Sequence, residues 1–293
     1  MLKIFTNQVR GGWSPNDLEK FLGGSEESIV LLAEALTRAG KEVKVYHNPR
    51  DGTETERNGV KYQDHSMAEF WASDEVITFR TPVPWQTGAT AAKQIHYTCD
   101  VEFPWDTTKV TYAVISKYGA ARNVFVENPV VMYLGVDIES LEKNKQQQVP
   151  GTMLYSASPD RGLETLLKDW EEIHKRYGLE LRVTYDDLQI PGVTCLGRIS
   201  KDEMEQEFWK AEYWVHPVNR PDSELFCLNA VKARHCECKR VIKNVGALKE
   251  TAGDYIDYDG FVKGSKETIQ QEGIPIMDWD EMAKNWLTLL ERV

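Results

Sequence analysis

The chain has 293 residues, of which 41% are hydrophobic, enough to form the core of one large domain or of two ordinary ones. Its formal net charge of −11 argues against a nucleic-acid-binding protein and against attraction to anionic membranes. No run of about 18 apolar residues occurs, so no membrane span is expected. The short polar start MLKIFTNQVR is not typical of a signal peptide, and we expect a cytoplasmic protein.

The chain contains five cysteines, and without a secretion signal this odd number predicts free thiols. They are Cys99, Cys195, Cys227, Cys236 and Cys238. Cys236 and Cys238 lie close to His235, but a structural metal site needs a second pair of ligands elsewhere, which the spacing does not offer. We therefore expect no metal held by protein ligands.

The first half opens with the pattern of a strand, a loop, a helix and a second strand. Short apolar runs predict strands at Leu2–Thr6 and Glu42–His47. Between them a helix is expected from Ser25, its predicted N-cap, to Ala39. Its apolar stripe consists of Ile29, Leu32, Ala33 and Leu36. This order is typical of the start of a Rossmann-like domain.

Gly23 and Gly24 stand immediately before this helix. They could let a phosphate or a sugar approach the backbone closely, or they could simply form the turn. The surrounding pattern is not G-x-G-x-x-G, so it does not indicate a nicotinamide or flavin cofactor.

Four further strands are expected in the first half, and each is followed by polar or small residues. They are Glu75–Phe79, Lys93–Thr98, Val110–Ile115 and Val130–Leu134. Ligands of open α/β sheets bind at the carboxyl ends of the strands. If the sheet is parallel, these strand ends line one crevice.

The stretch Glu139–Pro150 is polar and lacks an apolar face, so we place the domain boundary there, between residues 145 and 146. The second half repeats the alternation of strands and helices. Helices are expected at Arg161–Arg176, Lys201–Lys210, Glu224–Arg234 and Trp279–Arg292. Strands are expected at Thr152–Tyr155, Glu180–Tyr185, Val193–Leu196, Tyr213–His216 and Lys239–Ile242. The predicted fold class is α/β, with two Rossmann-like doubly wound parallel-sheet domains facing a central cleft.

Two stretches of the second half are candidate ligand sites. Ser156–Leu167 follows a strand and brings hydroxyls and Arg161 to a helix N-terminus, the layout of an anion site or of an ordinary turn. In Ser223–Lys232, Glu224 could cap the helix. It could instead accept hydrogen bonds from sugar hydroxyls while the N–H groups of Phe226 and Cys227 face a phosphate. The residues alone leave these alternatives open.

Several stretches, in order, together resemble the retaining glycosyltransferases of family 4, which have the GT-B fold. The first-half matches are Gly23-Gly24-Ser25-Glu26, Ser116-Lys117-Tyr118 and Leu134-Gly135-Val136-Asp137. The second-half matches are Tyr155–Leu167, Gly197, Tyr213–Pro217, Glu224–Lys232 and Gly246–Thr251. The resemblance covers most of the chain. It implies an acceptor-side domain at 1–145, a donor-side domain at 146–278 and a final helix, 279–293, that crosses back to the first domain.

The resemblance also implies roles for single residues. Arg161 would hold the donor diphosphate and stabilise it as the leaving group, and Glu224 would bind the donor sugar's hydroxyls. Asp100 would belong to the catalytic set. The remaining donor-binding residues would be Gly23, Gly24, Ser156, Ser158, Gly197, Arg198, Phe226, Cys227, Leu228 and Lys232. Ser156 stands where the family often has a second basic residue.

This chain departs from the family's pattern at two places. Lys232 replaces the second Glu of the E-x7-E motif, and a Lys cannot accept a hydrogen bond from a ribose hydroxyl. It could bind an extra anionic group or be solvated on the helix. Cys99-Asp100 stands where the family often has His-Asp, and His96 is expected to be a core residue of its strand.

The implied activity is transfer of a sugar from a UDP- or GDP-sugar to a hydroxyl of a saccharide or other acceptor, with retention of anomeric configuration by front-face displacement. No metal need be bound by protein ligands, although Mg2+ could accompany the donor diphosphate. The alternative is a non-catalytic or degenerate protein that binds nucleotide sugars without turning them over.

Overall fold

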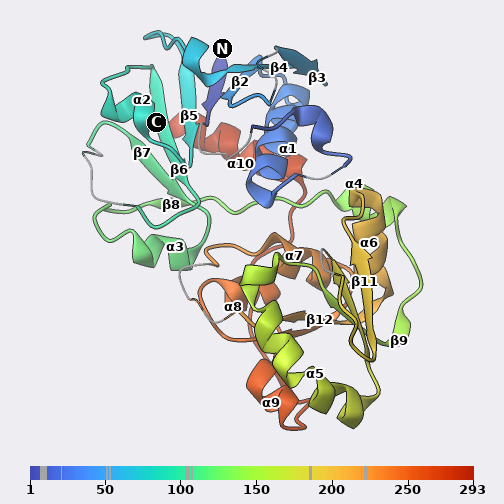
Figure 1. Cartoon of the computed structure of the whole chain (residues 1–293). Coiled ribbons are helices and arrows are strands. Elements are labelled where there is room, and N and C mark those ends of the chain that lie inside the picture. Colours follow the sequence, from blue (N-terminus) through green and yellow to red (C-terminus); the bar gives the residue numbers. More distant parts are fainter. Residues whose placement is uncertain are drawn as a thin grey trace. The chain divides into compact units, whose positions relative to one another are not determined.

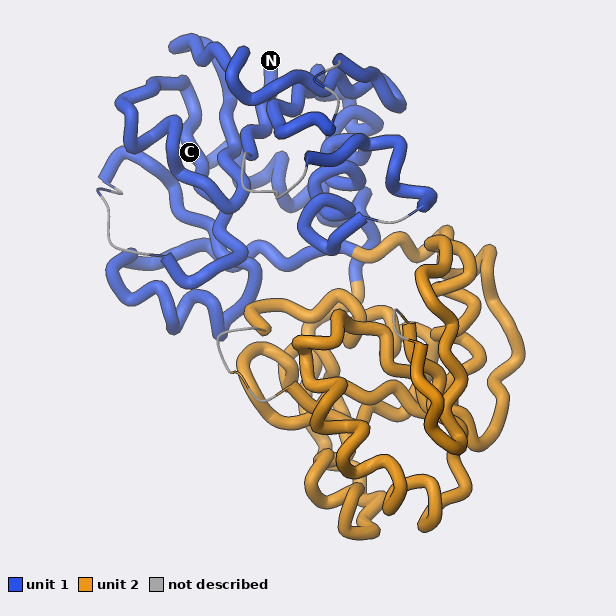
Figure 2. Tube along the Cα trace, viewed as in Figure 1, with its two compact units in different colours: residues 1–135, 277–293 blue, residues 136–276 orange. Residues whose placement is uncertain are grey.

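The computed structural model describes residues 1–6, 12–20, 22–50, 52, 54–102, 106, 108–184, 187–218, 220 and 224–293. Some predicted features lie outside these residues, namely part of the loop after the first strand, the strand residue Tyr185 and the candidate site residue Ser223. The chain divides into two compact units (Figure 2). Unit 1 comprises Met1–Gly135 and Met277–Val293, and unit 2 comprises Val136–Ile276.

Unit 1 contains an eight-stranded sheet with the order β3-β4-β2-β1-β5-β6-β7-β8 (Figure 1). Its strands are β1 Leu2–Phe5, β2 Val43–His47, β3 Thr55–Arg57, β4 Val60–Asp64, β5 Glu75–Phe79, β6 Lys93–Thr98, β7 Thr111–Val114 and β8 Val130–Val131. Neighbouring strands are parallel except for the antiparallel pair of β3 and β4 at one edge. In the centre, Ile4 of β1 lies opposite Val45 and Ile77.

The helices of unit 1 are α1 Gly24–Arg38, α2 Val83–Gln86, α3 Lys117–Arg122 and α10 Trp279–Arg292. The N-cap of α1 is Gly23, so the prediction of Ser25 as N-cap is wrong, and Ser25 lies inside the first turn. Helix α10 packs against α1, and its Trp286 meets Tyr97 of β6 edge to face at 4.9 Å. These contacts join the C-terminal segment to unit 1.

Unit 2 contains a seven-stranded sheet with the order β11-β10-β9-β12-β13-β14-β15. Its strands are β9 Val149–Tyr155, β10 Glu180–Thr184, β11 Val193–Gly197, β12 Ala211–His216, β13 Lys239–Ile242, β14 Tyr255–Asp257 and β15 Thr268–Ile269. Its helices are α4 Ile138–Lys143, α5 Leu163–Tyr177, α6 Lys201–Lys210, α7 Leu228–His235, α8 Leu248–Ala252 and α9 Tyr258–Val262. All pairs are parallel except that of β14 and β15.

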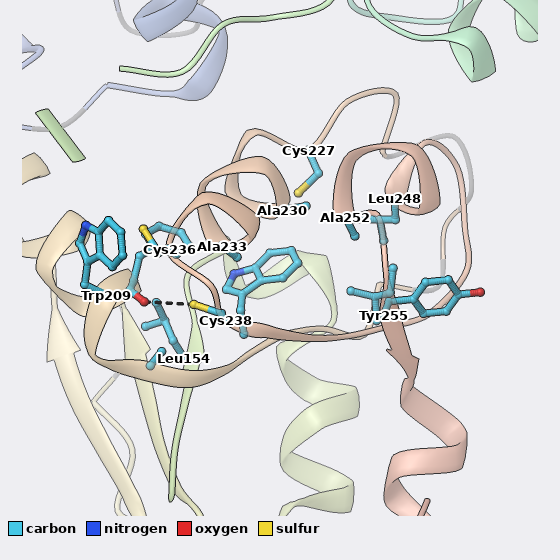
Figure 3. Packing of buried hydrophobic residues seen from close by; sticks show 14 of the residues in the cluster. Leu154, Trp209, Cys227, Ala230, Ala233, Cys236, Cys238, Leu248, Ala252 and Tyr255 are labelled. Atoms are coloured by element: carbon cyan, nitrogen blue, oxygen red, sulfur yellow. Dashed lines mark hydrogen bonds between the residues drawn. The ribbon is translucent and has the colours of Figure 1, made fainter. Parts of the chain in front are cut away.

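Two hydrophobic clusters form the core of unit 2, one on each face of the sheet. Successive residues of β9 alternate between them, since Leu154 belongs to one cluster while Met153 and Tyr155 belong to the other. The first cluster packs under α6, α7 and α8, as Figure 3 shows, and there the Cys238 thiol donates to the Phe208 carbonyl oxygen. The second packs under α5 and α9. Burial on both faces is typical of a doubly wound parallel sheet.

The polar stretch that resembles a linker is folded structure of unit 2. Leu141 of α4 is fully buried, and its carbonyl oxygen accepts a hydrogen bond from Trp209 Nε1 at 2.7 Å. Ser140 Oγ donates to Glu205 of α6 at 2.7 Å. The units therefore divide after Gly135, whereas the predicted boundary lies between residues 145 and 146. A short helix with polar exposed faces has too little periodicity to reveal its one buried residue.

The predicted α/β class with two parallel-dominated Rossmann-like units is confirmed. All five cysteines are free thiols, as expected. Within the described residues, no helix is both long and apolar enough to cross a bilayer.

Candidate functional site

The candidate site of unit 2 lies where the adjacent parallel strands β9 and β12 end. After β9, the 3-10 turn Pro159–Arg161 carries Arg161 to the start of α5. Gly162 follows with φ +106°, and a Cβ atom there would lie 2.9 Å from the Pro217 carbonyl carbon. Only glycine allows this approach and this backbone conformation, so the sequence R-G brings the two loops together.

Arg161 and Glu224 meet at this point. Arg161 Nη1 donates to Glu224 Oε1 at 3.2 Å, and about a third of the Arg161 side chain (35%) stays exposed. The Glu224 carboxylate is buried, and its backbone carbonyl oxygen accepts from Ala247 N at 2.7 Å. The contacts of this carboxylate with the described residues are made by Oε1, and no hydrogen bond joins Oε2 to any of them.

His216, which is not among the predicted site residues, also contacts Glu224. Its Nε2 lies 3.1 Å from Glu224 Oε1, and its ring stacks on Trp214 at 5.3 Å with 12° between the planes. Trp214 Nε1 in turn donates to Ser156 Oγ at 2.9 Å. The available signal is a histidine at the carboxyl end of a predicted strand, eight residues before Glu224. The sequence does not show that its ring turns toward that carboxylate.

The start of α7 differs from the prediction. The helix begins at Leu228 with Cys227 as its N-cap, so the expected start at Glu224 is wrong, and Glu224 does not cap this helix. A carboxylate four residues before the first helical residue lies outside the capping position. Burial raises the pKa of the Cys227 thiol well above its ordinary value, which keeps the group neutral.

Other predicted donor residues occupy distinct places in unit 2. Lys232 is buried on α7, so the alternative of a solvated helix residue is wrong. Ser156 is buried and its carbonyl oxygen accepts from Asn229 Nδ2 at 2.8 Å. Ser158 is exposed and donates to Asp160 at 2.6 Å. Arg198 is exposed after β11, and β10 separates that strand from β9.

In unit 1 the structure joins Asp100 to an arginine that is not among the predicted site residues. Arg80 Nε donates to Asp100 at 2.9 Å, and Arg80 Nη1 donates to Ser25 Oγ at 3.2 Å. Arg80 has φ +65°, an uncommon conformation for a residue with a side chain, and such strain clusters at functional sites. Gly23 and Gly24 are exposed at the start of the same helix as Ser25.

His96 is a fully buried strand residue, as expected. Its Nδ1 lies 2.8 Å from Thr78 Oγ1, and its Nε2 lies 2.7 Å from Glu102 Oε1. Burial opposes ionisation of Glu102, but the hydrogen bonds from His96 and Tyr112 hold the pKa of its carboxyl below the ordinary value.

Three side chains of unit 2 could in principle coordinate a cation. His216, Glu224 and Cys227 are all buried, and each offers a ligand atom within 4.8 Å of the other two. These are residue types that bind zinc. However, Glu224 Oε1 already accepts from the Arg161 guanidinium, and a dication bound to the same carboxylate would lie beside that positive charge. The arrangement therefore favours a paired carboxylate.

The two Rossmann-like units with parallel-dominated sheets match the GT-B fold of solved glycosyltransferase structures. No protein-family model and no curated protein sequence matches the chain. The likeness is instead to solved structures, and at their low sequence identities it shows the fold alone.

A sucrose-phosphate synthase from Thermosynechococcus elongatus is similar with a TM-score of 0.68 and 13% identity, over 100% of this chain and 99% of its own. AviGT4, a glycosyltransferase involved in avilamycin A biosynthesis, is similar with a TM-score of 0.65 and 13% identity, over 99% and 97% of the two chains. Anabaena HepE in complex with UDP-glucose is similar with a TM-score of 0.55 and 13% identity, over 99% and 90%.

Proposed function

We propose that this chain is a retaining glycosyltransferase that moves a sugar from a UDP- or GDP-sugar to a hydroxyl of a saccharide or other acceptor. The observation that carries the proposal is the meeting of Arg161 and Glu224 at the carboxyl ends of β9 and β12 in a GT-B fold. A cation and a carboxylate lie side by side there. A sugar-nucleotide donor needs both, because it carries a diphosphate and sugar hydroxyls. A structure with the same fold, HepE, binds UDP-glucose.

Arg161 is assigned to the donor diphosphate. A guanidinium offers five N–H donors in a planar fork that suits phosphate oxygens, and Arg161 is partly exposed beside the start of α5. As the bond to the sugar breaks, negative charge grows on the leaving diphosphate. A fixed positive charge beside it stabilises that transition state.

Glu224 is assigned to the donor sugar. Its Oε1 is engaged by Arg161 and His216, and its Oε2 is the oxygen that accepts hydrogen bonds from sugar hydroxyls. Lys232, buried on α7, supplies positive charge in place of the second carboxylate of the E-x7-E motif. Other donor contacts are assigned to Ser156, Ser158, Gly197, Arg198, Phe226, Cys227 and Leu228 of unit 2, and to Gly23 and Gly24 of unit 1. Asp100, paired with Arg80 in unit 1, is assigned to the catalytic set.

We assign front-face displacement to the reaction, with the acceptor hydroxyl attacking on the side from which the diphosphate leaves. A diphosphate oxygen takes the acceptor's proton, the sugar–oxygen bond to the acceptor forms, and the bond to the diphosphate breaks. Because Arg161 and Glu224 already form an ion pair, Glu224 is suited to hydrogen bonding rather than to nucleophilic attack. Mg2+ could accompany the diphosphate without protein ligands.

The proposal is tested first by binding. A nucleotide sugar at about 100 times its Kd stabilises the native state by roughly 2.7 kcal/mol, which a thermal-shift panel of UDP-, GDP- and ADP-sugars would detect. The donor found is then used in a transfer assay in which NMR reads the anomeric configuration of the product. If no sugar nucleotide shifts the melting temperature and none is consumed, the proposal is wrong.

Variants locate the activity. Arg161→Ala and Glu224→Gln should abolish most transfer. Unit 2 offers a matched control in the ion pair of Arg176 and Glu172, which lies along α5 at 2.6 Å. Arg176→Ala and Glu172→Gln should keep wild-type activity. If the variants of both ion pairs lost transfer activity equally, the assigned site would not be where the reaction occurs.

A further inference from the structure

His216 has no role in the mechanism above, yet it touches the residue assigned to the donor sugar. It is the last residue of β12 and is only 2% exposed. Its Nε2 approaches Glu224 Oε1, while its Nδ1 is buried without a hydrogen-bond partner in the part of the chain that the structure describes. The two ring nitrogens therefore have unequal surroundings.

This inequality decides where the ring proton lies. A neutral imidazole has one donor nitrogen and one acceptor nitrogen. With the proton on Nε2, the ring donates to the carboxylate, and only an acceptor lone pair at Nδ1 is left without a partner. With the proton on Nδ1, a lone pair would face the carboxylate oxygen and a buried donor would have no acceptor, which is the costlier arrangement. The geometry thus assigns an Nε2–H donor to Glu224.

The ring also packs against an aromatic neighbour. Trp214 stacks on one of its faces and is tied by its indole N–H to Ser156 Oγ. The Ser156 carbonyl oxygen accepts from Asn229 of α7. These contacts connect the loop after β9, which carries Arg161, with the strand end that carries His216. The donor nitrogen consequently has a defined position before any ligand binds.

We propose that His216 is a positioning residue that fixes the rotation of the Glu224 carboxylate, so that Oε2 is presented to the hydroxyls of the donor sugar. Arg161 and His216 hold Oε1 from two sides, and a carboxylate held at one oxygen by two donors cannot exchange its oxygens. Arg161 is partly exposed, whereas His216 is buried and supplies the second contact to Oε1. This inference rests on the proposed function.

The proposal predicts different effects on the binding of a sugar nucleotide and on the binding of the nucleotide alone. UDP-glucose carries the hydroxyls that Glu224 Oε2 would bind, whereas UDP lacks them. Loss of the His216 donor should therefore weaken UDP-glucose binding and leave UDP binding nearly unchanged. A general disturbance of unit 2 would weaken both ligands.

The experiment is calorimetric titration of the full chain with UDP-glucose and with UDP. For His216→Ala we expect the Kd for UDP-glucose to rise roughly tenfold, equivalent to one lost hydrogen bond to a charged group, with less than about a twofold change for UDP. His216→Gln, whose amide can donate to Oε1, should recover part of the loss. If the thermal-shift panel finds a donor other than UDP-glucose, the titration uses that sugar nucleotide and the corresponding nucleoside diphosphate.

His174 provides a matched control. It lies on α5 in the same unit, packs on Trp170 at 5.7 Å and has one ring nitrogen 2.7 Å from the Leu179 carbonyl oxygen. His174→Ala should lower the melting temperature as His216→Ala does, without changing the ratio of the two dissociation constants. An unchanged ratio in His216→Ala, or an equal change in His174→Ala, would overturn the positioning role.

Failure of the proposed function is seen separately. If the wild-type protein binds no sugar nucleotide, the proposed function falls, and the positioning role falls with it. Imidazole 15N NMR gives a readout that does not depend on binding. It should show the Nε2-protonated ring in the wild type and a changed His216 signal in Glu224→Gln. An Nδ1-protonated ring would overturn the positioning role even in a protein that binds donor.

Discussion

Arg161 and Glu224, which are 63 residues apart in the chain, form a hydrogen-bonded ion pair of 3.2 Å at the ends of two adjacent strands. The pair depends on Gly162, whose positive φ lets the loop after β9 reach the backbone of Pro217. The carboxylate is buried whereas the guanidinium is partly exposed. The arginine can therefore contact both Glu224 and a bound ligand.

Replacing Arg161 by alanine should lower kcat/KM for sugar transfer by on the order of 100- to 1,000-fold, the usual effect of removing a group that stabilises developing charge. Arg161→Lys should recover only part of this, since a lysine lacks the planar fork. Initial rates with the donor found in the thermal-shift panel check the prediction. A rate within about threefold of that of Arg176→Ala would contradict the role of Arg161.

Gly162→Ala should destabilise the protein by roughly 1–3 kcal/mol, because it combines a left-handed backbone with a contact against the Pro217 backbone. Gly178 is a matched control, since it also has a positive φ (+66°). A Cβ atom added there would have no described neighbour within 4 Å. Gly178→Ala should therefore be the milder change. Urea unfolding of both variants measures the difference, and equal losses would show that the approach of the loops does not require Gly162.

Trp286→Ala should destabilise unit 1 by roughly 3–5 kcal/mol, as expected for a large side chain removed from a core. Trp286 is 1% exposed and packs against Tyr97, which attaches α10 to the sheet. Trp71 of the same unit is 61% exposed, so Trp71→Ala should change stability little. Chemical denaturation of the two variants tests whether α10 is part of the unit 1 core.

Acid should destabilise the protein between about pH 6.5 and pH 4 through His47. Burial lowers the pKa of this ring to about 4, and the nearby Asp64 offsets that effect only in part. Below about pH 6.5, His47 is protonated in the unfolded chain but stays neutral in the folded chain. The free energy of unfolding therefore falls by roughly 3 kcal/mol by pH 4.

His47→Phe keeps an aromatic ring between Trp13 and Tyr62 and removes the titrating group. The free energy of unfolding of this variant, measured by urea at pH 7, 5.5 and 4, should depend less on pH than that of the wild type. The same dependence in both proteins would show that His47 is not the group responsible.

Chelation of metal ions by EDTA should lower transfer without abolishing it, because Arg161 supplies positive charge at the diphosphate. Added Mg2+ should restore the full rate. Complete loss of activity that only Zn2+ restores would instead indicate that His216, Glu224 and Cys227 bind a metal.

Much of the secondary structure follows from local patterns. The predicted bounds of β5, β6, α6, β13 and α10 agree with the structure residue for residue. α6 and α10 each have a capping box at their N-terminus, and a cap depends only on residues within one turn. The start of α7 could not be predicted in this way, because the acidic Glu224 and the apolar residues after it resemble a first helical turn but lie before the helix.

The sequence by itself determined the α/β class, the two-unit organisation and, through a resemblance, the candidates Arg161 and Glu224. Only the tertiary structure decided that His216 turns toward Glu224 and that Arg80 pairs with Asp100. Periodicity and caps are properties of neighbouring residues, so they can be read along the chain. The partner of a polar side chain depends instead on which strands lie side by side. β9 lies beside β12 although β10 and β11 come between them in the sequence.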